Sequence, residues 1–421
     1  VLGENLNHNH VSDTVSALSE QLRTMYIRNY VDTWENALTR FHLSDATSLS
    51  QLNALIDNIT NNDSPLLQFL QAIYDNTYFE PVSSASPKLL ALGALLDKRN
   101  NSEILLTQIF TTLRTLHQEI QPVVTATNEE KAAFEMIANM TKNNHSPNVF
   151  LQLRLIADKS PEPLKTWLEK ISNDSWQLLM HEGNHYLDIS WNQQVIRAYQ
   201  ADIANRYPIS RNAKKEITLD KFSEFFGNPG VIIDFYHQYL TAFIDTSTPE
   251  WRWKLLGNTK LPFSEDTLRQ IQHAMRIHDT FFPNGDNKLL VQFSLQPYVF
   301  GKNIKSVAFN MNNRLVINDK AGARKSHALT WPGTDNVKTT SVQLLATNQQ
   351  MINRNFPGYW GWFKLVTQSI DSAVSPKKMV LNLSVNDWTA KYVLSTEGQY
   401  NPFLSVNLQH FYLPKKLTET A

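Results

Sequence analysis

The periodicity of apolar residues changes near residue 286, and this change constrains the fold more than any other feature of the sequence. Before it, apolar side chains recur at steps of three and four, the period of an amphipathic helix. After it they alternate, as in a strand with one buried face. We therefore predict a multidomain α+β chain, in which an all-α N-terminal region precedes a C-terminal antiparallel β-sandwich. A chain of 421 residues is too long for a single core, which agrees with two or three domains.

The first 285 residues are predicted to be helical. The stretch 24–41 carries one continuous apolar stripe, which is typical of a helix that faces a core. It consists of Tyr26, Tyr30, Trp34, Leu38 and Phe41.

Three further helices are predicted in the part that we assign to a helical domain, residues 1–210. One begins at Pro65, with Asp63 or Ser64 as its cap. A second covers 161–179, and a third runs from 191 to a stop near Pro208. The apolar side of the second helix is expected to contain Leu164, Trp167, Leu168, Ile171 and Leu178.

Residues 211–286 are predicted to form a helical subdomain, built on an aromatic helix-turn-helix. Phenylalanines at 222, 225 and 226 lead into a turn at 227–230, and an aromatic helix follows. Gly227 is expected to adopt the left-handed conformation that closes a helix. Ser264 is predicted to cap one more helix, which ends at residues 283–287.

Residues 287–421 are predicted to form the β-sandwich. Their short segments alternate in polarity and are rich in β-branched and aromatic residues, with turn residues between them. One segment, 358–374, has helical spacing instead, and we expect one short helix inserted there. Strands are predicted at 289–300, 306–312, 314–319, 326–333, 339–347, 378–385, 389–396 and 403–411.

Charge and cysteine content exclude several classes of function. Lysine plus arginine equals aspartate plus glutamate at 39 each, so no net field attracts nucleic acid. The sequence contains no cysteine, which excludes disulfides, thiolate zinc sites and cysteine nucleophiles. The longest apolar run, at 89–96, is far shorter than the ~20 residues of a membrane span. Because the chain begins at Val1 without a signal-peptide pattern, we expect a soluble piece of a longer protein, with any membrane anchor upstream.

The sequence HEGNH at 181–185 matches the zinc-peptidase pattern, in which two histidines one helical turn apart hold a metal beside a glutamate. A catalytic site also needs a third protein ligand. The position six residues after the second histidine is Trp191, and position 188 is Asp188. Asp202 and Glu216 are poorly placed for the alternative arrangement.

We therefore expect His181 and His185 to lie on a partly exposed helix face, while Tyr186, Leu187 and Trp191 pack. A zinc-dependent hydrolase that uses His181, Glu182 and His185 is kept as the alternative function. No serine-nucleophile elbow, phosphate-binding loop or dinucleotide fingerprint is found. We predict no catalytic, cofactor-binding or metal-binding residues, no cofactor and no small-molecule substrate.

Aromatic residues at 222–243 and 359–363 could form a ligand platform, but their helical spacing favours core packing. A third alternative is a sandwich that binds cell-wall glycan through exposed rings such as Trp331 or Trp388.

Several segments occur in an order that resembles one family. They include "MYIRNYVDTWENAL", "SPLLQFLQAI", "PLKTWLEKISNDSW", "WNQQVIRAYQADIANRYP", "FSEFFGNPGVIIDFYHQYLTAFID", "WPG", "GYWGWFKLV" and "NPF" followed by "FYLP". Together they resemble the C-terminal, periplasmic part of the IcmF/TssM family, from about residue 20 to about residue 415. This family comprises inner-membrane subunits of type VI secretion systems and of the related Dot/Icm type IVB system.

The resemblance implies a periplasmic scaffold and no enzyme. It implies an outer-membrane lipoprotein as a partner of the β-rich end, and a DotU/TssL-type inner-membrane partner through a membrane part that this chain lacks. The residues of the docking surface are not predicted. Richness in asparagine and lysine favours the type IVB branch, although some type VI proteins share that composition.

Overall fold

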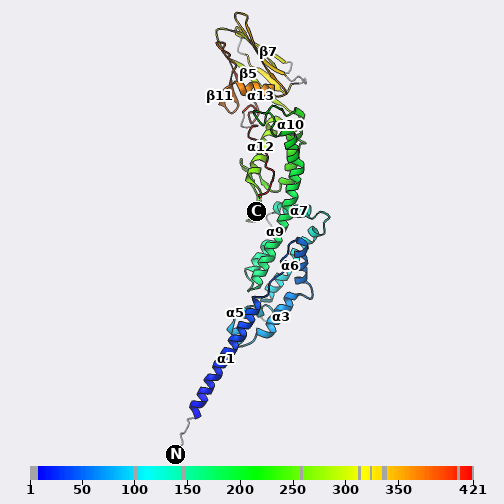
Figure 1. Cartoon of the computed structure of the whole chain (residues 1–421), viewed down its shortest axis with the longest axis vertical. Helices are drawn as coiled ribbons and strands as arrows, with labels where there is room; N and C mark the ends of the chain where they lie inside the picture. Colours follow the sequence, from blue (N-terminus) through cyan, green and yellow to red (C-terminus); the bar gives the residue numbers. More distant parts are fainter. Residues whose placement is uncertain are drawn as a thin grey trace, which may run out of the picture. The chain divides into compact units, whose positions relative to one another are not determined.

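The computed structural model describes residues 8–97, 102–143, 148–256, 259–311, 314–322, 325–333, 339–404 and 408–419. Within them the chain forms two compact units, Val1–Tyr186 and Leu187–Ala421, called here the N-terminal and the C-terminal unit. The predicted architecture, helices first and antiparallel sheets with an inserted helix last, is confirmed (Figure 1). The division into domains 1–210, 211–286 and 287–421 stays a prediction. Among the described residues, no helix is both long enough and apolar enough to cross a membrane.

The described elements of the N-terminal unit are helical. They are α1 (His8–Leu38), α2 (Leu49–Thr60), α3 (Pro65–Thr77), α4 (Val82–Ala85), α5 (Pro87–Ala94), α6 (Ser102–Val124), α7 (Glu129–Lys142), α8 (Val149–Ala157) and the part of α9 (Leu164–Ser190) up to Tyr186. Side-chain oxygens cap several of these helices, and the predicted cap at Ser64 is one of them. The Ser64 hydroxyl accepts from the Leu67 amide at 3.2 Å, and Pro65 occupies the first turn of α3. Asn128 and Asn148 cap α7 and α8 in the same way.

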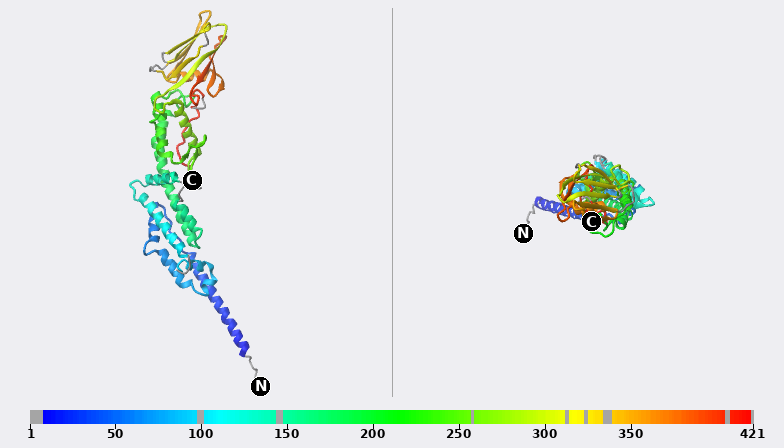
Figure 2. Two further views of the ribbon diagram at one scale, coloured as in Figure 1. Left: turned by 180° about the vertical axis from the view of Figure 1, so that it is seen from behind. Right: turned by 90° about the horizontal axis from the view of Figure 1, so that it is seen from above.

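Helix α1 is only partly packed, which corrects the expected stripe. Val31 and Leu38 are buried, and the Tyr30 hydroxyl donates to the Asn76 carbonyl at 3.0 Å. Tyr26 and Phe41, by contrast, are 70% and 54% exposed. Figure 2 shows the first half of α1, in dark blue, extending away from the other helices of its unit. The apolar spacing predicts a helix correctly, but it does not reveal where its neighbours end.

Helix α9 presents the expected apolar side to its unit with two corrections, of which the first is that Trp167 is only half-buried. Leu164, Leu168 and Ile171 are buried. Leu178 is only half-buried, and its neighbour Leu179 is fully buried instead. Either of the adjacent leucines could have faced the core. The rotation of the helix about its axis turns Leu179 inward and leaves Leu178 at the edge.

The C-terminal unit begins with helical elements that continue α9. They are the π-helices η1 (Trp191–Ile196) and η2 (Tyr199–Ile203), then α10 (Leu219–Phe226), α11 (Val231–Phe235), the π-helix η3 (Tyr236–Leu240) and α12 (Glu265–Phe281). The predicted cap at Ser264 is confirmed, since its hydroxyl accepts from the Thr267 amide at 3.3 Å.

Two expectations for this region are wrong. The described residues of the region, 211–256 and 259–286, include four two-residue strands, which are too short to give a periodic signal: β1 (Ile244–Asp245), β2 (Arg252–Trp253), β3 (Leu255–Leu256) and β4 (Thr259–Lys260). Gly227 closes α10 with φ of −75°, not in the left-handed region. A side chain there would collide with the Ser223 carbonyl oxygen at 2.6 Å and with Asn287 at 2.9 Å, so close approach of the backbone accounts for the glycine.

The sandwich consists of two antiparallel sheets. One has the order β10-β9-β6-β7 and the other the order β11-β12-β13-β5-β8. Buried residues alternate with half-buried ones along β9 and β13, apart from the exposed first residue of β9, as the predicted period of two requires. The strands are β5 (Val291–Phe300), β6 (Ile304–Met311), β7 (Arg314–Asp319), β8 (His327–Trp331), β9 (Thr339–Ala346), β10 (Met351–Pro357), β11 (Ile370–Ser375), β12 (Lys378–Asn382) and β13 (Ala390–Thr396).

Three differences from the predicted strands lie at sheet edges and at the C-terminus. β10 and β11 are edge strands that were not predicted. All six residues of β11 are exposed, so its sequence carries no alternation. The inserted helix α13 (Gly361–Ser369) is confirmed but ends where β11 begins. The strand predicted at 403–411 is absent from its described residues, 403–404 and 408–411, whereas residues 405–407 lie outside the described part.

An aromatic core joins the helical part of the C-terminal unit to the sandwich. Phe222 of α10 and Phe281 of α12 lie 5.1 Å apart, and each also contacts Trp360, which precedes α13. The Trp360 ring lies 4.8 Å from that of Trp331 in β8, and its indole nitrogen donates to the Ile217 carbonyl at 2.7 Å. These rings interlock, and the hydrogen bond from Trp360 to Ile217 ties the residue before α13 to the segment before α10. The sandwich therefore has a fixed position on these helices.

Candidate functional site

The zinc-peptidase motif lies on α9 in the N-terminal unit, and its two histidines point to solvent. His181 and His185 are exposed, with their rings parallel and 6.5 Å apart. His185 Nδ1 lies 2.9 Å from Glu130 Oε1 on α7. Burial raises the pKa of Glu129 above its usual value, and the nearby Glu182 raises that pKa further. Across the described residues, no group of three or more His, Asp or Glu side chains is placed to hold a metal ion.

Gly183, inside the motif, has a packing role. A Cβ atom at this position would lie 2.6 Å from Ile137 Cδ1 and 3.3 Å from the Phe134 backbone. The glycine therefore allows α7 to approach α9 closely. Tyr186 follows on the same side, with its ring 5.7 Å from that of Phe134. The pattern HEGNH thus contains a helix-packing residue between exposed imidazoles.

The residues considered as a third zinc ligand make other contacts, all within the C-terminal unit. The Asp188 carboxylate accepts from the amides of Leu417 and Thr418 and from the Thr418 hydroxyl, at 2.9, 3.2 and 2.6 Å. Asp202 forms an ion pair with Lys221, and Glu216 pairs with Lys364. Trp191 is fully buried and Leu187 with it, so the expected packing of both is confirmed.

The carboxylate of Glu216 also explains a tight contact near Gly358. It accepts from the Tyr359 amide at 2.8 Å, and a side chain at Gly358, whose φ is +99°, would collide with it. Burial raises the pKa of the neighbouring Tyr207 to about 12. Through Glu216, the loop before α13 is held against residues 207–217, so this carboxylate stabilises the fold.

The C-terminal segment 411–419 lies along the helical part of its unit as a strap. The Phe411 ring lies 5.8 Å from Tyr199 and 5.2 Å from Phe226. The Trp191 indole donates to the Pro414 carbonyl at 3.0 Å, and the Ser264 amide donates to the Leu417 carbonyl at 3.1 Å. Sequence analysis did not find this strap, because its contacts join residues more than 100 positions apart.

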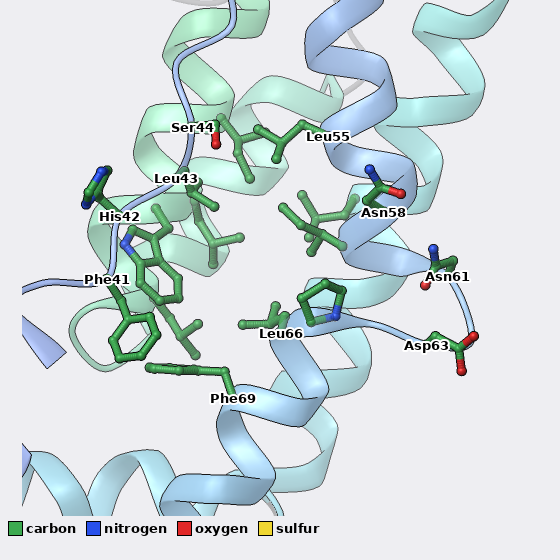
Figure 3. Close-up of a pocket in the computed structure, with 17 residues that line it drawn as sticks. Phe41, His42, Leu43, Ser44, Leu55, Asn58, Asn61, Asp63, Leu66 and Phe69 are labelled. Carbon is green, nitrogen blue, oxygen red and sulfur yellow. The ribbon is translucent and has the colours of Figure 1, made fainter. Parts of the chain in front are cut away.

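The N-terminal unit contains an apolar groove of about 540 Å³ between α2, α3, α9 and the loop 39–48 (Figure 3). Rings from Phe41, Phe69 and Trp167 form one wall, with centroids 5.1 and 5.3 Å apart. Polar side chains stand at its rim: His42 and Ser44 on one side, Asn58, Asn61 and Asp63 on the other. The groove resembles a ligand pocket in volume and in its mostly apolar lining.

The sandwich offers open sheet edges as docking surfaces. β7 and β10 are the edges of the four-stranded sheet, and β8 and β11 are the edges of the five-stranded sheet. On β7, Leu315 and Ile317 are 59% and 53% exposed, while Val316 between them is buried. An edge strand that displays apolar side chains invites pairing with another chain.

The rings proposed for glycan binding do not form an exposed platform. Trp331 is 1% exposed and lies in the aromatic core, which overturns its assignment as an exposed ring. Trp388 is half-buried in a turn between β12 and β13. In the clusters 222–243 and 359–363, the tryptophans and phenylalanines and Tyr239 are buried, which confirms the predicted core packing for these residues. Tyr236 and Tyr359 are only half-buried.

Three family models match this chain in order. Residues 1–78 match a model described as IcmF-related, intracellular multiplication and human macrophage-killing. Residues 183–287 match the type VI secretion protein IcmF helical domain, and residues 293–398 match the type VI secretion protein IcmF C2-like domain. The helical elements and the sandwich of the C-terminal unit therefore correspond to two successive domains of one class of secretion protein.

Comparisons with known proteins agree. The chain is 24% identical over 459 residues to the type VI secretion system component TssM1 of Pseudomonas aeruginosa, covering 99% of this chain and 41% of that protein. Its fold is similar to a chain of a type VI secretion system membrane core complex, with a TM-score of 0.68 at 19% identity, covering 98% of this chain and 87% of that one. A chain of a type VI membrane complex gives 0.64 at 20% identity, covering 96% and 86%.

The chain belongs to the IcmF/TssM family. It spans about two fifths of the length of its relative TssM1.

Proposed function

We propose that this chain is the periplasmic scaffold of a bacterial secretion system's membrane complex, and that its sandwich docks an outer-membrane lipoprotein. The observation that carries the proposal is the open edge strand β7, with its exposed Leu315 and Ile317, on a sandwich that is held by an aromatic core. The likeness to TssM1 and to chains of type VI membrane complexes supports this role.

A docking scaffold needs a rigid surface more than a reactive group. In the C-terminal unit, the aromatic core fixes the sandwich, and the strap 411–419 ties the chain end to α12 and to the end of α9. Such a platform keeps the sheet edges in place, so that a partner strand pairs without ordering the surface first. The scaffold is therefore proposed to work by shape, and we propose no enzymatic step.

The remaining partners are proposed from the family. The relative TssM1 is longer than this chain, and an inner-membrane partner of the DotU/TssL type would contact a part of the protein that lies outside it. Two of the three matching models and the named relatives are of type VI systems, which supports the type VI branch for this chain.

A binding measurement with purified lipoprotein tests the proposal. An outer-membrane lipoprotein of a type VI secretion system is immobilised, and the 421-residue chain is titrated over it. Changing Leu315 and Ile317 together to lysine puts two charges on the docking strand and should weaken binding at least about tenfold, because a single buried leucine contributes about 1.5–3 kcal/mol. Both residues are exposed, so the fold should persist.

The matched control is Met351→Lys on β10, the opposite edge of the same sheet, where the residue is equally exposed. This variant should bind as the unchanged chain does. Equal binding by the β7 double variant would overturn the assignment of β7. Deletion of residues 287–421 is a poorer test, since it would uncover Phe222 and Phe281 by removing Trp360.

A further inference from the structure

The first half of helix α1 carries an apolar stripe that its own unit leaves uncovered. Every described side chain from residue 14 to residue 26 is exposed. Val15, Leu18, Leu22 and Met25 follow one another at steps of three, four and three, with exposed fractions between 58% and 68%. Steps that alternate between three and four are the heptad spacing of a coiled-coil seam. We call these four residues the α1 stripe.

The α1 stripe faces away from the body of the N-terminal unit. Val31, which is buried against that unit, lies nine residues after Leu22. Nine residues correspond to about two and a half turns of helix, which places the two side chains on opposite faces. A second helix can therefore lie along the stripe without displacing any described contact of α1.

The next position of the seam favours a second copy of the same chain. Four residues after Met25 the heptad continues at Asn29, which is also exposed. One asparagine at such a core position is satisfied when it faces an identical asparagine, and it then fixes a parallel, in-register pair. A membrane surface or an unrelated apolar helix would leave this amide without a partner.

The flanks of the α1 stripe carry no charge that would repel a second copy. The residues that border it include Ser19, Gln21 and Tyr26. The nearest charged pair, Glu20 with Arg23, has its ion-pair contact at 3.9 Å and lies away from the seam. Like charges beside the seam normally exclude self-pairing, and they are missing between residues 15 and 26. Arg28 borders Asn29, and Asp32 takes the next core position, so the seam ends at Asn29.

We infer that the α1 stripe pairs with the same stripe of a second copy of this chain, as a short parallel coiled coil with Asn29 facing Asn29. The isolated first half of α1 is a long helix with no described neighbour in its unit, and helices gain most of their stability from packing an apolar face. Pairing supplies that contact. The inference is independent of which partner docks on β7.

Disulfide trapping tests this pairing well, because the chain contains no cysteine. Leu18→Cys places one thiol in the seam, where two copies bring their thiols together. Glu20→Cys, on the opposite face of the same turn, is the matched control. Under mild oxidation of the 421-residue chain, Leu18→Cys should form a covalent dimer, several-fold more than Glu20→Cys.

A second variant separates pairing from random collision. Adding Leu22→Asp to Leu18→Cys puts a charge in the seam and should reduce the covalent dimer to the Glu20→Cys level. In sedimentation experiments, Leu22→Asp alone should weaken dimer formation at least about tenfold. Equal dimer yields for Leu18→Cys and Glu20→Cys, or a covalent dimer that persists with Leu22→Asp, would overturn the inference and indicate that a different chain segment or protein covers the stripe.

Discussion

The two units of this chain bury different kinds of side chain. Among the described residues, the largest fully buried side chains all belong to the C-terminal unit, including Trp191, Trp331, Trp360 and Trp362. The N-terminal unit is closed by leucine and isoleucine, while its tryptophans at 34, 167 and 176 stay half-exposed. Interlocked rings resist sliding, whereas an aliphatic helical core leaves grooves and uncovered faces.

This difference separates two tasks. The C-terminal unit has a fixed core and presents sheet edges, which suits the docking of a partner strand. The N-terminal unit presents apolar helix surface, namely the α1 stripe and the groove beside Trp167. Apolar surface that a unit leaves exposed is a common mark of assembly.

The comparison predicts its largest effect for Trp360→Ala. The ring is fully buried among other rings, and its loss also leaves the Ile217 carbonyl without its donor. The free energy of unfolding of the C-terminal unit should fall by about 3–5 kcal/mol. Urea unfolding followed by far-ultraviolet circular dichroism measures it. Trp167→Ala, at the half-exposed ring of the N-terminal unit, should cost about 1–2 kcal/mol, and equal costs would remove the distinction between the units.

The next effect is a pH dependence of the C-terminal unit. Burial raises the pKa of Tyr207 to about 12, whereas an unfolded tyrosine titrates near about 10. The folded state therefore holds this proton more tightly, and stability is complete below about pH 10 and falls as pH rises towards about 12. The loss should reach up to about 3 kcal/mol. Tyr207→Phe should abolish this part of the dependence; an unchanged slope in that variant would contradict the assignment.

A smaller effect is expected at the zinc-like motif. Gly183→Leu forces a side chain into the contact between α7 and α9, where Ile137 and the Phe134 backbone already lie. The N-terminal unit should lose about 1–3 kcal/mol of unfolding free energy. The neighbouring Glu182→Gln should change it by less than about 0.5 kcal/mol and should leave lipoprotein binding unchanged. A function lost with Glu182→Gln would instead favour the hydrolase alternative.

The smallest effect is local to the strap. Asp188→Asn keeps the shape of the side chain but removes the charge that accepts from Leu417 and Thr418. Hydrogen exchange of the segment 411–419 should become about tenfold faster, which corresponds to about 1.4 kcal/mol, with little change in global stability. Thr418→Ser retains the hydroxyl and should behave as the unchanged chain. Unaltered exchange in Asp188→Asn would mean that the Phe411 ring contacts and the hydrogen bonds to the Pro414 and Leu417 carbonyls hold the strap without the carboxylate.

The sequence predicted the fold where periodicity was long, and it failed where structure depends on distant partners. The change of period near residue 286, the cap at Ser264 and the helix near 361–369 were all readable. β11 could not be predicted, since its six residues are all exposed and its strand geometry comes from pairing with β12. The burial of Trp331 likewise depends on rings from α12 and α13.

The candidate surfaces were less predictable than the fold. The spacing at 26–41 indicated an apolar helix face, but not that the face between residues 15 and 26 stays uncovered. Nor could alternation along residues 314–319 show that β7 lies at an edge, because strand order is a tertiary property. The motif HEGNH is the opposite case, because the sequence pattern is easy to recognise but suggests the wrong kind of site. Its glycine serves the packing of α7 against α9.

The proposal that the C-terminal unit docks a partner and the N-terminal unit pairs with a second copy is tested most directly by measuring lipoprotein binding and covalent dimer formation in the same variants. In a Leu18→Cys background, the lysine pair at Leu315 and Ile317 should lose lipoprotein binding and retain the covalent dimer. Leu22→Asp should lose the covalent dimer and retain lipoprotein binding. If either change abolished both activities while circular dichroism showed an intact fold, the two surfaces would be one, and the division between a docking unit and an assembling unit would be wrong.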